Sequence, residues 1–370
     1  MKRQSNGLLV ATSAAVLVIA ILASVLNHSP AGPQVAHGAA LTTTTSAAAI
    51  PTATIASSAT TPSAVAATPG AAPNASGSIA SASAGTAPAS TPATNPATPR
   101  YPNFTCQPPP ANSYATCLFT ESPGTTMTFY LWVPANYNPN TKYPLVLLLE
   151  GGGERADPNK TAAQNRQVLL SDPYAEVWGP GYPGPDDPGV QKNWPSFVVL
   201  PQVQAPAYYM PVPANTGSYT LPAQPTPSLR MAKEIVDAVR KAYTGVDSSR
   251  LYVTGLSMGG YGTWAMIEYW PNEFAAAAPI SGAGDPSRAS ELVNLPIWAF
   301  HSADDPIVPV SGSRDMIAAI RAAGGHPLYT EYTNYGHGAW VPTYSILGKP
   351  SPVPNFFSWL FSQRKATPTP

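Results

Sequence analysis

Short runs of apolar residues recur along the chain from Tyr101 onward, separated by polar or amphipathic stretches. Such runs, bounded by turn residues, predict buried strands. The predicted strands lie at 145–149, 197–200, 250–255, 275–282, 295–302 and 327–333.

Three amphipathic stretches between these strands predict helices. The first carries apolar residues at helical spacing over 229–239, with Thr226 as the expected N-cap and Pro227 as the first helical residue. The other two cover 259–269 and 311–323. Strands that are apolar throughout and alternate with helices predict an α/β fold, with a mostly parallel central sheet and helices on both faces.

Chemically versatile residues follow several of these strands directly. They are Gly151–Gly153, Ser257, Asp305 and His337. Because ligands of such sheets bind beyond the carboxyl ends of the strands, we expect these residues to meet at one edge. The stretch 175–226, rich in Pro, Gly and Tyr with one clear strand, predicts long loops that form part of the site wall.

The part before Tyr101 has a different composition. Apart from Lys2 and Arg3, it has no Lys, Arg, Asp or Glu before Arg100, and 27–99 is almost entirely Ala, Thr, Ser, Pro and Gly. Such a segment buries too little apolar surface to offset its ordering entropy. The expected organisation is a leader at 1–28, a disordered linker or stalk at 29–100, one catalytic α/β domain at 101–365 and a flexible tail at 366–370.

The leader has two interpretations. Lys2 and Arg3 precede an uncharged, mostly apolar segment, Gly7–Leu26, which fits either a cleaved signal peptide or an uncleaved membrane anchor. Both place the domain outside the cytoplasm, secreted, periplasmic or tethered at the cell surface. Export favours a disulfide between Cys106 and Cys117, with two free buried thiols as the alternative.

Charge and ligand patterns exclude several function classes. The formal net charge is zero, charged residues make up 10%, and no basic patch occurs, which excludes nucleic acid as a partner. Two cysteines alone cannot form a zinc site, and no H-E-x-x-H motif is present. We therefore expect no metal and no cofactor.

Residues 255–259, Gly-Leu-Ser-Met-Gly, form a G-x-S-x-G pentapeptide between a predicted strand and a predicted helix. In a sharp strand-to-helix turn this spacing exposes the hydroxyl of Ser257, and small residues two positions away avoid collisions. The alternatives are a glycine-rich turn with an incidental serine and a phosphate loop. The chain has no Gly-Lys-Ser/Thr to support a phosphate loop.

A nucleophilic serine needs a base and an acid. His337, in a polar loop after the last predicted strand, is the expected base. His301 is expected to support the loop that follows it, and His326 is expected to cap a helix end or lie on the surface. The acid is expected in the loop that contains Asp304 and Asp305, and either carboxylate could reach the site. A glycosidase-like use of both carboxylates has no other support.

The tetrahedral intermediate also needs hydrogen-bond donors for its oxyanion. One is expected to be the backbone N–H of Met258, next to the nucleophile. The second is expected from the glycine loop after the first core strand, at Gly152, with Gly151 or Gly153 as alternatives. A plain tight turn is the other interpretation of these glycines.

With these residues in place, the chain resembles the secreted α/β-hydrolases of the predicted-peptidase and phospholipase/carboxylesterase type, relatives of feruloyl esterases and polyhydroxybutyrate depolymerases. The resemblance covers about 125–364, on "YPLVLLLEGGGER", "RLYVTGLSMGGYGTW", "LPIWAFHSADDPIVPV", "YTEYTNYGHGAW" and "FFSWLFSQR". It implies an α/β-hydrolase fold and selects Asp305, four residues before Pro309, as the acid.

Two positions depart from the pattern of these relatives. Glu150 stands where they usually have histidine, and we expect its charge near the oxyanion to lower activity or shift it toward acidic pH, unless it hydrogen-bonds the loop from behind. Ser302 replaces a glycine, with no expected consequence.

The sequence thus predicts a serine esterase with the triad Ser257, His337 and Asp305. Trp264, Trp340, Tyr208 and Tyr209 are expected either to line the substrate pocket or to be core or rim aromatics. The alternatives are a serine peptidase with the same triad and a non-catalytic wall- or carbohydrate-binding relative.

Overall fold

The computed structural model describes residues 103–180, 189–345 and 355–365. The chain divides into two units, Met1–Ala87 and Pro88–Pro370, and all described residues belong to the second. The predicted leader, the whole predicted linker with its boundary at residue 100, and the predicted tail lie outside the described residues.

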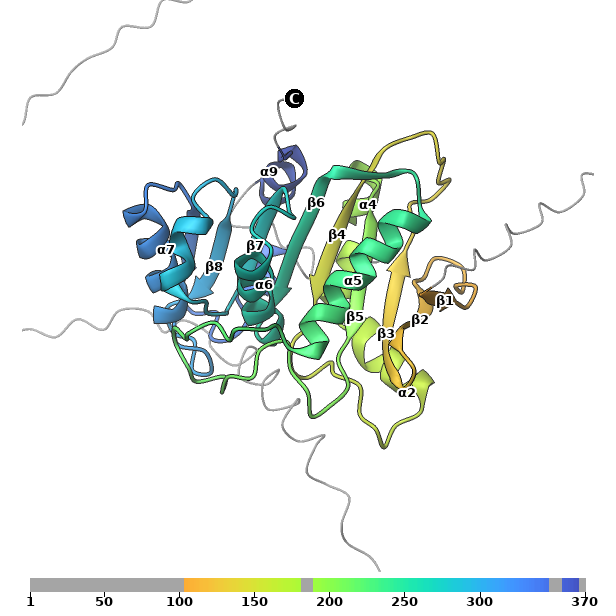
Figure 1. Cartoon of the computed structure of the whole chain (residues 1–370), viewed down its shortest axis with the longest axis horizontal. Helices are drawn as coiled ribbons and strands as arrows, with labels where there is room; N and C mark the ends of the chain where they lie inside the picture. Colours follow the sequence, from red (N-terminus) through yellow and green to blue (C-terminus); the bar gives the residue numbers. More distant parts are fainter. Residues whose placement is uncertain (1–102, 181–188, 346–354, 366–370) are drawn as a thin grey trace, which may run out of the picture. The chain divides into compact units, whose positions relative to one another are not determined.

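Nine strands of the described residues form one sheet, in the order β1-β2-β3-β5-β4-β6-β7-β8-β9 (Figure 1). From β5 to β9 all neighbours are parallel, whereas β1, β2 and β3 pair antiparallel at one edge. The strands are β1 (Phe104–Cys106), β2 (Ala115–Ser122), β3 (Thr125–Trp132), β4 (Tyr143–Leu149), β5 (Phe197–Gln202), β6 (Val246–Leu256), β7 (Ala276–Ile280), β8 (Trp298–Ser302) and β9 (Leu328–Tyr332). The prediction of a mostly parallel α/β sheet is confirmed.

The antiparallel edge was not predicted from the sequence. Its strands are only half buried, so apolar and polar residues alternate in β2 instead of forming a continuous apolar run. Gly124, with φ of +83°, makes the turn between β2 and β3. Cys106 lies opposite Cys117 in the β1–β2 ladder, and the two form a disulfide.

Helices cover both faces of the sheet. They are α2 (Ala162–Leu170), α3 (Pro173–Trp178), α4 (Gly189–Asn193), α5 (Pro227–Ala242), α6 (Met258–Tyr269), α7 (Ser311–Ala322), α8 (Trp340–Thr343) and α9 (Phe356–Ser362), with a 3₁₀ helix, η1, at Pro286–Glu291. Because side chains alternate along a strand, Leu147 of β4 packs in the core shared with α5, α6 and α7, whereas Leu148 packs with α3, α4 and α9. The sheet therefore separates two hydrophobic cores.

The capping residues predicted for α5 are confirmed. The Thr226 side chain accepts a hydrogen bond from the N–H of Leu229 at 3.1 Å, and Pro227 is the first helical residue. The apolar stripe predicted over 229–239 is buried. This stripe fixes α5 against the sheet next to α6 (Figure 1).

The stretch 175–226 is only partly loop, which corrects the prediction. The end of α3 and the whole of α4 lie within it. These helices are too short to show a sequence period, but Tyr174 and Trp178 of α3 are fully buried. The remainder, 203–226, is a loop that crosses the edge of the sheet where β4 and β6 end (Figure 1).

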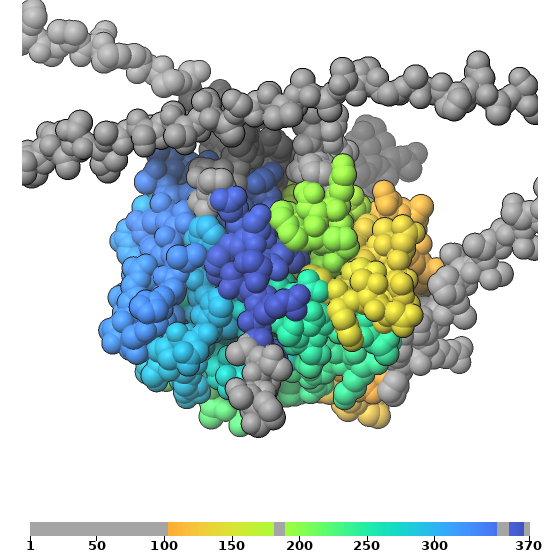
Figure 2. Space-filling view, turned by 90° about the horizontal axis from the view of Figure 1, so that it is seen from above, coloured from red at the N-terminus to blue at the C-terminus, as the bar shows by residue number. Residues whose placement is uncertain are grey.

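The C-terminal helix α9 closes the second core. Phe361 of α9 stacks on Trp194 with ring centroids 5.5 Å apart, and Phe357 meets Trp178 at 5.2 Å. Figure 2 shows the same contact as the dark blue C-terminal segment lying against the light green segment around α4. Aromatic packing therefore joins the end of the described chain to its middle.

Candidate active site

Ser257 occupies a sharp turn between β6 and α6. Its backbone has φ of +54° and ψ of −115°, a conformation that side-chain-bearing residues rarely adopt. Its N–H donates to the carbonyl of Ile280 at 3.0 Å, which ties the turn to β7. The hydroxyl makes no capping bond to α6, although serine commonly caps helices. The turn thus leaves this hydroxyl available to another partner.

That partner is His337, in the loop that follows β9. Its Nε2 lies 2.8 Å from the Ser257 hydroxyl oxygen, and its Nδ1 lies 2.8 Å from Oδ2 of Asp305. An ionised carboxylate can only accept a hydrogen bond, so the Nδ1–H of His337 donates to Asp305. Its Nε2 then carries no proton and accepts a hydrogen bond from the Ser257 hydroxyl. The structure therefore brings Ser257, His337 and Asp305 into one hydrogen-bonded chain.

The side chain of Asp305 is inaccessible to solvent, and both of its oxygens have hydrogen-bond partners. Its Oδ1 accepts hydrogen bonds from the N–H groups of Ile307 at 2.9 Å and Val308 at 3.0 Å. Burial opposes ionisation of Asp305, but hydrogen bonds from His301 and His337 and the charge of His337 together hold its pKa below the usual range. This arrangement keeps Asp305 ionised.

His301 and His326, the other two histidines within residues 103–365 that the structure describes, lie where the sequence places them. His301 is buried on β8, with Nδ1 2.8 Å from the Ser313 hydroxyl and Nε2 3.1 Å from the carbonyl of Val308. Its Nε2 is also 3.4 Å from Oδ2 of Asp305, so it supports the acid loop. His326 is exposed beyond the end of α7.

Asp304, the neighbouring carboxylate, is exposed and serves the histidine loop instead. Its Oδ1 accepts from the Ser302 hydroxyl at 2.5 Å, and its Oδ2 accepts from the N–H of Gly336 at 3.3 Å. The Ser302 oxygen also accepts from the N–H of Tyr335 at 3.3 Å. The serine at 302, expected to have no consequence, thus helps to fix the loop that carries His337.

The glycine loop lies against the turn that carries Ser257. A Cβ added to Gly151 would be 2.9 Å from Cδ1 of Leu256, whereas one added to Gly152 would have no atom within 4 Å. Gly152 is therefore open on the side where a side chain would stand. Its role as oxyanion donor with the N–H of Met258 remains a prediction.

Glu150 does not carry the charge expected beside the oxyanion. It is fully buried, and its Oε1 accepts from the N–H of Val203 at 2.6 Å. Burial raises the pKa of Glu150 well above the usual range, which favours the uncharged acid. The carboxyl binds Val203, directly after β5, and not the glycine loop, and the effect of Glu150 on activity remains a prediction.

Gly259 allows the start of α6 to approach β4, and its replacement by alanine is expected to destabilise the fold by about 3 kcal/mol. A Cβ there would lie 2.1 Å from the carbonyl oxygen of Leu149, a backbone atom of the central sheet that cannot move aside. Urea unfolding checks this, with Gly153→Ala as the matched control because a Cβ at Gly153 meets nothing within 4 Å. Equal stability of the two variants would contradict the packing argument.

The loop 203–226 is held over α6 by tyrosines. The hydroxyl of Tyr261 donates to the carbonyls of Ala214 and Thr216, and that of Tyr269 donates to the carbonyl of Pro222 at 2.7 Å. These bonds fix the loop along α6, from Tyr261 near the start of the helix to Tyr269 at its end, and its part in the site wall remains a prediction.

A buried carboxyl supports the same loop. Glu268 of α6 is fully buried, and its oxygens accept from the hydroxyl of Tyr219 at 3.1 Å and the N–H of Asp285 at 2.7 Å. The Asp285 carboxylate in turn accepts from the N–H of Leu221 at 2.7 Å. Burial raises the pKa of Glu268 from 4.5 to about 8.

Glu268→Gln is therefore expected to flatten the dependence of stability on pH. The unfolded carboxyl ionises near 4.5 and the folded one near 8, so wild-type stability is fully present below 4.5 and is lost as pH rises through 8. Relative to wild type, the variant should gain about 3.5 kcal/mol in free energy of unfolding between pH 5 and pH 8. Urea unfolding at both pH values measures the gain, with exposed Glu291→Gln as control. If the free energy of unfolding of Glu268→Gln differed from that of wild type by the same amount at pH 5 and at pH 8, the prediction would be refuted.

The four predicted pocket aromatics separate into two pairs. Trp264 and Tyr209 are fully buried in the core under α6, so the structure corrects the expectation that they contact substrate and supports their core role. Trp340 lies edge-on to the His337 ring, with centroids 5.3 Å apart, and Tyr208 is 44% exposed. Only this second pair can contribute to the rim of the site.

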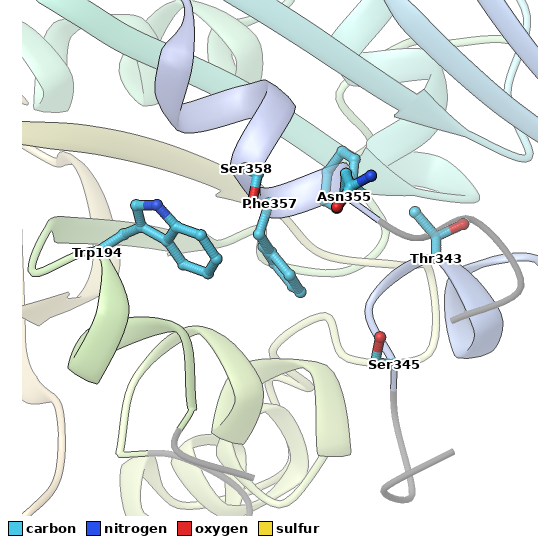
Figure 3. A pocket seen from close by; sticks show the side chains of 7 residues that line it. Trp194, Thr343, Ser345, Asn355, Phe357 and Ser358 are labelled. Atoms are coloured by element: carbon cyan, nitrogen blue, oxygen red, sulfur yellow. The ribbon is translucent and has the colours of Figure 1, made fainter. Parts of the chain in front are cut away.

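The cavity in Figure 3 lies elsewhere. It has a volume of about 120 Å³ and contains none of the triad residues. Its lining residues are Trp194, Thr343, Ser345, Asn355, Phe356, Phe357 and Ser358. The reaction site is instead defined by the contacts among Ser257, His337 and Asp305.

Comparisons with known proteins agree with this site. A family model, Esterase ("Putative esterase"), matches residues 120–323, a span that includes Ser257 and Asp305 and ends before His337. The crystal structure of a thermostable esterase is 33% identical, with a TM-score of 0.51 over 68% of this chain and 63% of that chain.

Two curated relatives also match, one named an acetylxylan esterase/xylanase and the other a depolymerase. The chain is 25% identical to the bifunctional acetylxylan esterase/xylanase XynS20E of Neocallimastix patriciarum over 190 residues, 51% of this chain and 23% of that protein. It is 50% identical to poly(3-hydroxyalkanoate) depolymerase C of Paucimonas lemoignei over 50 residues, 14% of this chain and 12% of that protein. The match therefore spans less than a quarter of each of these relatives.

The family model covers more than half of the chain, and the parallel sheet, its flanking helices and the turn at Ser257 agree with it. The chain therefore belongs to the esterase family of α/β-hydrolase fold.

Proposed function

We propose that this protein is a serine hydrolase that cleaves carboxylic esters through an acyl-enzyme intermediate on Ser257. One observation carries the proposal. The Ser257 hydroxyl, the His337 ring and the Asp305 carboxylate are linked by contacts of 2.8 Å each, at the edge where the parallel strands end. Family membership supports the ester as the bond that is cleaved.

In the proposed mechanism the Ser257 oxygen attacks the ester carbonyl carbon while Nε2 of His337 takes the hydroxyl proton. Asp305 keeps Nδ1 protonated and stabilises the imidazolium that forms. The N–H groups of Gly152 and Met258 stabilise the oxyanion of the tetrahedral intermediate. His337 then protonates the departing alcohol, and water releases the acyl group by the same steps in reverse.

The rim suggests which esters are accepted. Trp340 offers a flat aromatic surface beside His337, and the exposed Tyr208 lies against Arg155, which binds the glycine loop; such rings suit an acyl or sugar group carried on a larger molecule. The two curated relatives are named for polymeric substrates, acetylxylan and poly(3-hydroxyalkanoate). We include both polymers as proposed substrates.

The proposal places the enzyme outside the cytoplasm. The apolar segment Gly7–Leu26 and the disulfide between Cys106 and Cys117 support this location. Among the described residues no helix is long and apolar enough to span a membrane. The corresponding proposed organisation is a signal peptide or membrane anchor at 1–28, a linker at 29–100 and a catalytic domain at 101–365.

A substrate panel tests the proposed function. It compares p-nitrophenyl acetate, a feruloyl ester, acetylated xylan, a hydroxyalkanoate oligomer and a peptide p-nitroanilide, with Ser257→Ala as control. Ester hydrolysis at least tenfold faster than amide hydrolysis would support an esterase. Faster amide hydrolysis would favour the peptidase, and hydrolysis of none of them would favour the binding relative.

A further inference from the structure

Arg155 connects the glycine loop to the loop 203–226. Its Nε donates to the carbonyl of Gly152 at 2.9 Å, and its Nη1 donates to the carbonyls of Ala207 at 3.1 Å and Pro206 at 3.3 Å. The guanidinium also lies over the Tyr208 ring, 4.2 Å from its centroid. One planar side chain therefore fixes two loops relative to each other.

The bond to Gly152 has a consequence for the backbone. Glycine has a wide choice of φ and ψ, so a run of three glycines does not hold its own peptide planes. Neighbouring atoms do not hold Gly152 and Gly153 either, because a Cβ on each would meet nothing within 4 Å. The carbonyl of Gly152 thus depends on Arg155 for its direction.

Glu154 holds the other end of the same run. Its Oε2 packs so closely against Gly151 that it would be only 2.6 Å from a Cβ on that glycine. Gly151 also packs against Leu256, the residue before Ser257. This end of the loop is therefore fixed against the nucleophile turn.

These two anchors lie on either side of one peptide unit. Glu154 packs against Gly151 before it, and Arg155 binds the carbonyl of the peptide after it. The peptide between them joins Gly151 to Gly152 and carries the N–H expected to stabilise the oxyanion. Its N–H is free to meet a substrate while both of its neighbours are fixed, which is the arrangement that preorganised donors need.

We propose that Arg155 is a positioning residue for the oxyanion hole: by holding the Gly152 carbonyl, it sets the direction of the donor on the glycine loop. The inference rests on the proposed function. Because the oxyanion exists only in the transition state and tetrahedral intermediate, loss of Arg155 lowers kcat and leaves KM nearly unchanged. A residue that bound the substrate itself would raise KM instead.

The test compares wild type with Arg155→Met and Arg155→Lys. Lysine keeps the positive charge, but its single ammonium group cannot donate to three separate carbonyls as the planar guanidinium of Arg155 does. Arg321→Met is the matched control, since Arg321 of α7 also donates to a backbone carbonyl, that of Pro327 at 3.3 Å, and its hydrogen bond involves neither the glycine loop nor the triad. Rates with a p-nitrophenyl ester are expressed per active site, titrated with a fluorophosphonate, so that any unfolded fraction does not count.

We expect kcat of Arg155→Met to fall by roughly 10- to 100-fold, less than complete loss of one donor, with KM within a factor of about three. Affinity for a boronic acid that forms a tetrahedral adduct should fall by the same factor as kcat/KM. The kcat and the boronate affinity of Arg155→Lys should lie between those of wild type and Arg155→Met. Those of Arg321→Met should equal the wild-type values.

Two results would overturn the inference: an unchanged kcat, or a raised KM with unchanged kcat and unchanged boronate affinity. Wild-type protein that hydrolyses no ester would instead refute the proposed function, so the two failures are distinguishable.

Discussion

Ser257→Ala is expected to lower kcat for ester hydrolysis by roughly 10⁶-fold, to the level left by binding and the oxyanion donors alone. The variant lacks the oxygen that forms the acyl-enzyme, and no neighbouring hydroxyl takes its place in the contact with Nε2 of His337 at 2.8 Å. Initial rates with p-nitrophenyl acetate measure the loss.

The fold should survive this change. The Ser257 hydroxyl makes no capping bond, and alanine meets the same backbone strain at φ of +54° as serine does. Thermal melting of the variant is therefore expected to match wild type within a few degrees, as for a change of about 1 kcal/mol or less. More than a tenth of wild-type activity in a folded variant would contradict the role of Ser257.

Asp305→Asn is expected to lower kcat by about 10⁴-fold while the protein stays folded. The N–H groups of Ile307 and Val308 both donate to Oδ1, so they select the amide oxygen for that position. The amide NH₂ must then occupy the position of Oδ2, which faces Nδ1 of His337 at 2.8 Å. Two donors cannot share that contact, so the ring adopts the tautomer with a proton on Nε2 and cannot accept from Ser257.

Asp304→Asn is the matched comparison. Asp304 is exposed, and both of its contacts, with the Ser302 hydroxyl and the Gly336 N–H, require only an acceptor. The single amide oxygen of asparagine can keep one of these two contacts. We therefore expect kcat to fall by less than about tenfold, because the loop that carries His337 is held less firmly. Comparison of kcat for the two variants decides which carboxylate is the acid. A larger loss at Asp304 would reverse the assignment.

The pattern of the sequence was sufficient for the central part of the fold. Continuous apolar runs identify β4 and β6 because both faces of these strands are buried, and the caps of α5 identify its start. The turn at Ser257 is recognisable because its small neighbours are a local steric requirement. The chain order of Ser257, Asp305 and His337 then limits the candidates for acid and base.

The remaining features depend on contacts between distant segments. Nothing near Glu150 in the sequence indicates that Val203 binds its carboxyl, and nothing near Trp264 indicates that it is fully buried. The same holds for Arg155, whose carbonyl partners at Pro206 and Ala207 lie more than fifty residues away. The only signal available was the position of Arg155 directly after the glycine loop.

Covalent labelling of the nucleophile tests the central claim most directly. Wild-type protein is treated with a fluorophosphonate, digested, and mapped by mass spectrometry, beside Ser257→Ala and His337→Gln. The account predicts one adduct, on Ser257, formed at least 100-fold more slowly in His337→Gln and absent in Ser257→Ala. An adduct on another serine, or equal labelling rates with and without His337, would contradict it.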